Sequence, residues 1–317
     1  MKTTQFILGL ALAITFFSCN RDDNEDRGTI TSEEMQINAK IDIASDDVSN
    51  IVEEQLTSED GIAGRGTDSA TQFLPDCADV VRVPETGVPA VGENIVKTIN
   101  FGTTGCEMPN GNVLKGVIII TIPYLPDATT HTITYQFVNF YHNAIKFDGT
   151  KTFTRSMSAA VDGHPIVTMN MDLNATFPNG NVYTRVGTRV REIIEGMSTP
   201  LVLSDNVYKI TGSWTTTFPS TTVQTSVITT PLHVKMSCMS VNKPLLVSGV
   251  ITITRNDNVA TLDYGDGTCD NVAIFTFNGV SRLITFEEYW FLFSEERFQF
   301  FGTFFLTAKY ARKGQRA

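Results

Sequence analysis

IVTMNMDLNATF (residues 166–177) alternates apolar and polar residues over its whole length. In an extended strand, successive side chains point to opposite faces, so this pattern separates an apolar face from a polar one. The apolar face would carry Val167, Met169, Met171, Leu173 and Ala175. The stretch therefore predicts a β-strand with one buried face and one face in water.

Similar alternating segments occur from Cys77 to about Phe286, for example HTITYQFVNF (131–140) and VYKITGSW (207–214). Six dipeptides between such runs suit the positive φ angles of two-residue hairpin turns: Asn110-Gly111, Asp148-Gly149, Asp162-Gly163, Asn179-Gly180, Asp266-Gly267 and Asn278-Gly279. Because no helical segment separates the runs, we predict an all-β domain of antiparallel sheets over residues 76–286. About ten strands are too many for one open sheet. We therefore expect a sandwich, a barrel or two stacked duplicated β-modules.

An internal repeat bears on the cysteines. KTINFGTTGC (97–106) aligns without gaps with ATLDYGDGTC (260–269), and PNGNV occurs at 109–113 and again at 178–182. We infer a duplicated unit at about 77–122 and 238–286. Each copy has an earlier cysteine, so the duplication favours the bridges Cys77–Cys106 and Cys238–Cys269. Pairing between equivalent cysteines of the two copies would also respect the symmetry and stays open.

The second copy contains a cluster of aspartates that resembles a cation site. Asp263, Asp266 and Asp270 lie within nine residues of each other, but calcium takes six to eight oxygen ligands. The matching residues of the first copy are Asn100, Thr103 and Glu107, so the carboxylates are not shared. We interpret the three aspartates as turn residues and expect no metal.

Near the start of the sequence, Lys2 precedes an apolar run, Phe6 to Phe17, which is followed by Ser18-Cys19. This pattern predicts a lipoprotein signal peptide over residues 1–18 and lipidation of Cys19, with an ordinary secretory signal as the alternative. An acidic tether (19–30) precedes an amphipathic helix (31–57), in which Thr31 and Glu34 have capping-box spacing. The helix could pack on the domain, pair with a partner helix or act as a spacer. A linker (58–75) and an atypical aromatic tail (287–317) complete the chain.

The histidines and one arginine-rich segment are further candidates for a functional site. The histidines His131, His142, His164 and His233 are scattered, which predicts surface or hairpin positions. In VYTRVGTRVRE (182–192), the side chains of Tyr183, Arg185, Arg189 and Arg191 share one strand face. This stripe could contact an anionic glycan or lipid head group. The alternative is a solvated outer face.

Several segments together carry a resemblance to a known family. They are the cysteine-terminated signal peptide, NIVEEQLTSEDG (50–61), INFGTTGCEMPNGNVLKG (99–116), VGTRVREIIEG (186–196), VYKITGS (207–213) and LDYGDGTCDN (262–271). The chain resembles an uncharacterised family of Bacteroidetes cell-envelope lipoproteins over residues 1 to about 286. The resemblance implies display at the cell surface or in the periplasm and supplies no catalytic residues.

Charge restricts the function classes. Residues 20–60 carry thirteen acidic and three basic residues, which accounts for the formal net charge of −10. The remainder is nearly neutral and has no basic patch for nucleic acid. We expect a non-catalytic protein that is anchored to the outer membrane through Cys19, with display on the cell surface favoured over the periplasm. We expect it to use no cofactor and to bind a glycan, a protein or an envelope component. A structural or assembly component is the alternative, and an envelope hydrolase is less favoured. An exposed aromatic platform around Trp214 would favour a glycan, whereas an exposed edge strand would favour assembly.

Overall fold

A computed structural model describes residues 28–62, 73–156, 166–199 and 202–286. The predicted signal peptide, Cys19, most of the acidic tether and the aromatic tail lie outside these ranges. The described chain forms one long helix, α1 (Ser32–Ile62), followed by antiparallel strands and two short 3₁₀ segments. No helix in these ranges has the length and apolar character needed to cross a membrane.

The described residues contain fourteen strands. Their bounds are β1 (Asp79–Val83), β2 (Asn94–Asn100), β3 (Cys106–Glu107), β4 (Val113–Pro123), β5 (Thr130–His142), β6 (Ile145–Ser156), β7 (Ile166–Thr176), β8 (Val182–Glu195), β9 (Val207–Thr217), β10 (Val223–Lys235), β11 (Leu246–Arg255), β12 (Asn258–Asp266), β13 (Val272–Phe277) and β14 (Val280–Thr285). The 3₁₀ segments are η1 (Leu203–Asp205) before β9 and η2 (Met236–Val241) before β11.

All fourteen strands belong to one sheet. Apart from β3, which pairs only with β4, each strand lies next to its neighbour in sequence, from β1 at one end to β14 at the other. The prediction of an antiparallel β fold with one N-terminal helix is therefore confirmed. Instead of a sandwich, a barrel or two modules, the strands form a single open sheet. This sheet contains more strands than we expected one open sheet to hold.

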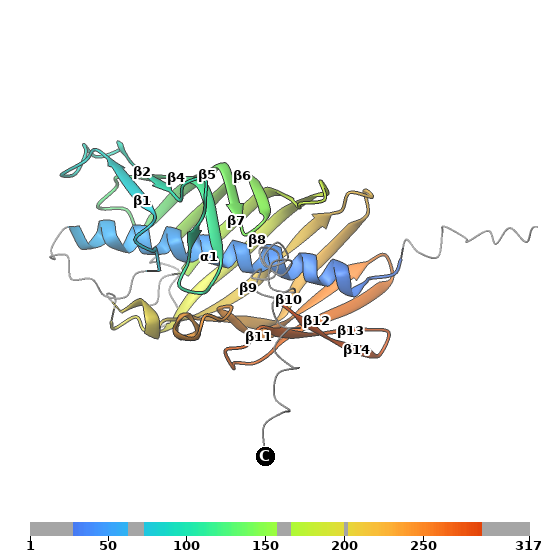
Figure 1. The fold of residues 1–317 in the computed structure, drawn as a ribbon. Coiled ribbons are helices and arrows are strands. Elements are labelled where there is room, and N and C mark those ends of the chain that lie inside the picture. Colours follow the sequence, from blue (N-terminus) through green and yellow to red (C-terminus); the bar gives the residue numbers. More distant parts are fainter. Residues whose placement is uncertain (1–27, 63–72, 157–165, 200–201, 287–317) are drawn as a thin grey trace, which may run out of the picture.

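The sheet reaches this width by bending around α1. Figure 1 shows the helix running across the sheet, with β1 to β6 on one side of it and β11 to β14 on the other. Glycines inside strands contribute to the bend. A Cβ at Gly149 would lie 2.4 Å from the Asp172 carbonyl oxygen, and one at Gly212 would lie 2.2 Å from that of Thr188. Both glycines have positive φ angles, 122° and 136°. Asp148-Gly149 is therefore a bend inside β6 and not the hairpin turn that we predicted.

Helix α1 fills the concave side of the sheet. Its capping box is present: Thr31 N donates to Glu34 Oε2 (3.1 Å) and Glu34 N to Thr31 Oγ1 (3.3 Å). The helix begins one residue later than predicted and ends five residues later, at Ile62. From Ile41 to Val52 almost every side chain is buried, including those on the acidic face. Of the three roles that we considered for the helix, packing on the domain is the one observed.

The β7–β8 hairpin fixes which strand faces meet the helix. Phe177 N donates to the Asn181 carbonyl oxygen (2.9 Å), so the loop is the three residues Pro178 to Gly180 and not the predicted dipeptide turn. The prediction for β7 is confirmed, because all five residues of its apolar set are buried. In this register Arg185 lies opposite Leu173, and Arg189 lies opposite Met169. The arginines therefore point to the same face as the core of β7.

Both predicted disulfides are present, Cys77–Cys106 and Cys238–Cys269, with Cα–Cα distances of 5.7 and 5.3 Å. The two repeated segments also share backbone features. Asn100 Oδ1 accepts the N–H of Gly102, and Asp263 Oδ1 accepts that of Gly265, each at 2.9 Å. Asp263 therefore has the same structural role as the uncharged Asn100.

Candidate functional site

The predicted ligand stripe lies inside the protein. Arg185 and Arg189 have no exposed side-chain surface, and Arg191 and Tyr183 are also buried. On the opposite face of β8, Val182 and Val186 are exposed. The division of the strand into two faces was right, but both outward-facing interpretations of the arginines were wrong. Their partners are acidic and amide side chains of α1.

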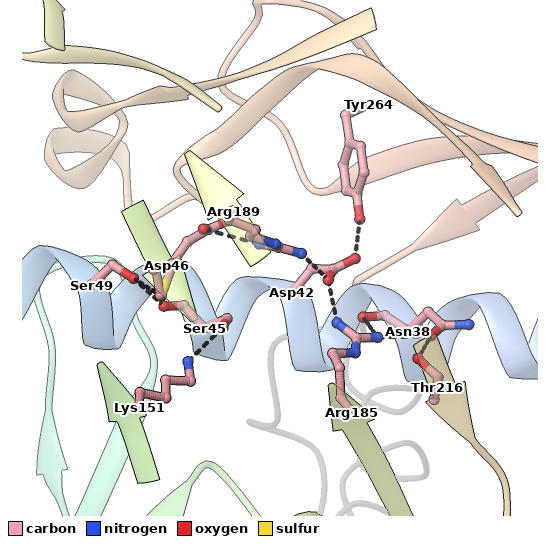
Figure 2. Close-up of polar contacts among 11 residues, drawn as sticks. Asn38, Asp42, Ser45, Asp46, Ser49, Lys151, Arg185, Arg189, Thr216 and Tyr264 are labelled. Atoms are coloured by element: carbon pink, nitrogen blue, oxygen red, sulfur yellow. Dashed lines mark hydrogen bonds and ion pairs between the residues drawn. The ribbon is translucent and has the colours of Figure 1, made fainter. Parts of the chain in front are cut away.

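Asp42 is the centre of this buried network (Figure 2). Its Oδ1 accepts hydrogen bonds from the guanidinium groups of both Arg185 and Arg189, and its Oδ2 accepts the hydroxyl of Tyr264 at 3.4 Å. Arg185 also donates to Asn38 Oδ1 at 2.7 Å. One carboxylate of the helix thus connects β8 with β12, two strands that lie far apart in the sheet.

The network continues along the helix. Arg189 Nη1 lies 3.3 Å from Asp46 Oδ1, and Arg191 pairs with Glu53 at 3.3 Å and donates to Asn50 Oδ1. These contacts follow the helix at intervals of three or four residues, the spacing that places side chains on one helical face. The acidic face of the helix is therefore the face that meets the sheet.

Aromatic rings on β9 cover the guanidinium groups. The Arg189 guanidinium lies 4.2 Å from the centre of the Trp214 ring, and that of Arg191 lies 3.5 Å from the centre of the Tyr208 ring. Such cation–π contacts are strengthened when water is excluded. Trp214 is buried, so it does not form the exposed aromatic platform that would have favoured glycan binding.

Burial changes the ionisation of two groups in the network. Burial raises the pKa of Asp46 from 3.8 to about 6, although Arg189 and Arg191 favour its charged form. Burial also lowers the pKa of Lys151 from 10.5 to about 7, with Arg189 acting in the same direction. The Lys151 ammonium donates to Ser45 Oγ at 2.7 Å. The partners of both groups lie inside the protein, so we assign Asp46 and Lys151 to the packing of the helix on the sheet.

A second set of contacts holds the C-terminal half of α1. Glu59 pairs with Arg82 of β1 at 3.0 Å and with Lys97 of β2 at 2.8 Å. The carboxylate of Glu54 accepts the N–H groups of Phe73 and Leu74, at 3.1 and 3.0 Å, which fixes the end of the predicted linker. The helix is therefore joined to the β1 end of the sheet as well as to its centre.

Asp47 lies on the other side of α1 and has different partners. It accepts hydrogen bonds from the side-chain amides of Asn110 and Asn112 and pairs with His142 Nε2, all at 2.8 Å. His142 is buried, so a surface position is wrong for this residue. It lies in the closing pair of the β5–β6 hairpin, the other position that we predicted for the histidines. The Asp47 carboxylate thus fastens two loops of the first half of the sheet to the helix.

A pocket of about 60 Å³ lies beside this cluster. One wall comes from the loops that carry Asn110 to Asn112 and His142 to Ile145. The opposite wall comes from Asn242, Asn271 and Phe286, and the helix contributes Lys40 and Ile43. The pocket therefore lies between the two halves of the sheet, over the helix. Its lining contains no Asp or Glu among the described residues, so it offers no carboxylate pair for a hydrolase.

The remaining predicted residues have local roles or lie outside the described ranges. Asp266 and Asp270 each accept the N–H of the residue two positions later, at 3.1 Å, as turn residues do. No cluster with the composition of a metal site occurs among the described residues. His233 Nδ1 lies 3.0 Å from Ser248 Oγ, and His131 is half-buried. Cys19 and His164 lie outside the described ranges.

Sequence reasoning missed Asp42, Asp46, Asp47 and Lys151 as members of a site. A signal was present, because the acids of α1 and the arginines of β8 have opposite charge and each set follows the period of its own element. This signal could be used only if two facts were known: that the helix packs on the sheet, and which face of β8 points inward.

The fold and the site define the class as an open antiparallel β-sheet wrapped around a buried, ion-paired helix. Comparison of the chain with protein-family models, with curated proteins and with solved structures finds no match.

Proposed function

We propose that the protein is a lipid-anchored, non-catalytic binding protein of the bacterial envelope. Its membrane anchor would be the lipid on Cys19, its location the outer membrane with the folded domain outside the cell, and its ligand a glycan, a protein or an envelope component. The cysteine-terminated signal peptide, the acidic run after it and the resemblance to Bacteroidetes lipoproteins support the anchor and the location.

The observation that carries the non-catalytic role is the internal pairing of ionisable groups. Asp42 and Asp46 pair with arginines, and Asp47 pairs with His142. A general acid or base must reach a substrate atom within hydrogen-bond distance. Groups that are buried and bonded to each other stabilise a scaffold instead, and they leave loops and outer strand faces for binding.

The anchor is tested by labelling cells of a Bacteroidetes-type host with radioactive palmitate. We expect label and membrane association for the wild type and loss of both for Cys19→Ala. Added protease should digest the wild type on intact cells, and neutral substitutions in the acidic run 20–27 should protect it. Label on Cys19→Ala would contradict the proposed anchor, and protection of the wild type would contradict surface display.

A structural or assembly role is the second proposal, and the edge strand β1 favours it. β1 has no partner strand on its outer side among the described residues, and Val80, Val81 and Val83 are exposed. An apolar edge strand can pair with a strand of another protein. Val81→Lys should abolish co-purification of an envelope protein. Val186→Lys is the matched control, because Val186 on the central strand β8 is equally exposed, at 51%.

A further inference from the structure

The pocket beside Asp47 has walls that are fixed before any ligand arrives. Asn110 follows the bridged Cys106 by four residues, and Asn242 and Asn271 follow Cys238 and Cys269 by four and two. The two disulfides thus hold opposite walls. Beneath them, Asp47 binds Asn110, Asn112 and His142 to the helix. Preorganised walls reduce the entropy that binding costs.

The lining chemistry selects the class of ligand. Five of the twelve lining residues are asparagines. The amides of Asn110, Asn112 and Asn143 are held by bonds to Asp47, to backbone N–H groups and to each other, and an amide with one bond at each end keeps a second hydrogen and a second lone pair. Formal charge is nearly balanced: Lys40 lines the pocket, and the lone pairs of Asp47 are engaged by three donors. An anion would meet amide oxygens and the carboxylate below, and a cation would meet amide hydrogens. A hydroxyl group both donates and accepts, so it matches this lining.

Apolar groups also line the pocket. Ile145 and Phe286 lie beside the asparagines on the two walls, and Ile43 comes from the helix. The volume of about 60 Å³ holds a few water molecules, since one water needs roughly 10–15 Å³. It therefore accepts one edge of a ring and leaves the rest in solvent. A ring with a hydroxylated edge and an apolar face is a pyranose sugar.

We propose that this pocket binds one edge of an uncharged sugar, either a free monosaccharide or the terminal residue of a glycan. The proposal rests on the proposed function, because it takes the protein as a binding protein and names the ligand class and the site.

The test measures sugar binding to the purified protein by saturation-transfer NMR, in a detergent without a sugar head group. The probes are D-glucose, D-galactose, D-mannose and N-acetyl-D-glucosamine, each free and as its methyl glycoside, which represents a chain end. D-glucuronate and D-glucosamine report on charge. We expect at least one uncharged sugar to bind, and its charged counterparts to bind more weakly.

Two pairs of variants locate the site. Gly111→Asn adds a side chain at the pocket, and Gly180→Asn makes the same change in the equivalent Pro-Asn-Gly loop. Both glycines have φ near +84° and open space around a Cβ, and Asn tolerates this conformation. Asn242→Gly removes a lining amide, and Asn256→Gly is its control, since both residues have φ near +52°.

We expect Gly111→Asn to reduce affinity at least tenfold. Asn242→Gly should weaken binding roughly three- to tenfold, the effect of one neutral hydrogen bond. The two controls should bind as the wild type does. Absence of binding by all uncharged probes, tighter binding of glucuronate or glucosamine, or unchanged binding by both pocket variants would overturn the proposal. Palmitate labelling of Cys19 would be unaffected, so failure of this site is distinguishable from failure of the proposed anchor.

Discussion

Two carboxylates of α1, five residues apart, are buried in different ways. Asp42 faces the sheet and accepts bonds from two guanidinium groups. Asp47 faces the loops and accepts bonds from two amides and an imidazole. On the sheet side, charge is balanced by charge and covered by aromatic rings. On the loop side, a single carboxylate is solvated by hydrogen-bond donors beside a pocket.

The difference explains how a polar helix can fill the core of a β-sheet. Transfer of an unpaired charge into the interior is costly, and a buried ion pair compensates for that cost only when its geometry is good. The arginines of β8 provide this compensation and specify which helical face meets the sheet. The single carboxylate on the loop side needs less compensation for its burial, because the pocket gives water access to the amides that bind it.

Loss of Asp42 should have the largest effect. Asp42→Ala leaves Arg185 and Arg189 buried without their shared carboxylate, and breaking such a pair costs about 3–5 kcal/mol. Urea unfolding followed by circular dichroism measures this loss. Asp148→Ala is the control, because its pair with Lys146 is partly exposed to solvent and should contribute about 0–1 kcal/mol. A loss below 1 kcal/mol for Asp42→Ala would contradict the central position of this residue.

Loss of Asp47 should cost less. Asp47→Ala leaves the amide donors of Asn110 and Asn112 without an acceptor, for which about 1–3 kcal/mol is expected, and water from the pocket can replace part of the carboxylate. The same unfolding experiment measures the effect. An effect larger than that of Asp42→Ala would reverse the contrast between the two sides of the helix.

Removal of the indole should have a smaller effect still. Trp214→Phe weakens the contact with Arg189 and should cost about 1 kcal/mol. Trp214 Nε1 has no hydrogen-bond partner, so no bond is lost with it. Unfolding curves of Trp214→Phe in wild-type and Asp42→Ala backgrounds test the coupling. Equal losses in both backgrounds would mean that the ring does not act through the ionic network.

The effect expected at Asp46 depends on pH. Its folded pKa of about 6 exceeds its ordinary 3.8, so the folded state binds the proton more tightly. The contribution of this group to stability is therefore fully present below pH 4 and is lost as the pH rises to 6. Asp46→Asn should gain stability relative to the wild type across that interval. A relative loss over the same interval would contradict the sign.

Much of the fold was predictable from sequence, whereas the site was not. Alternation identified the buried face of β7, and the repeat identified both disulfides, because these signals are local. The predicted turn between β7 and β8 agreed with outward-facing arginines. A two-residue turn would put Arg185 opposite Asn174, but the three-residue loop puts it opposite Leu173. A slip of one residue turns every side chain of a strand to the other face.

The loop itself contained the missing information. Phe-Pro-Asn-Gly-Asn (177–181) recurs as Phe-Pro-Ser-Thr-Thr (218–222), and both sequences form the same three-residue connection. In the first loop only Gly180 has a positive φ angle, whereas a two-residue turn of the predicted kind needs two such residues in succession. Asn278-Gly279 has both and forms the predicted turn.

The central claim is that α1 is a buried part of the sheet and not a spacer above it. Hydrogen exchange of the backbone amides measures this directly. We predict that the amides of residues 41–52 exchange as slowly as those of β7 and β8, through global unfolding alone. Rapid exchange of this segment while β7 and β8 stay protected would contradict the account.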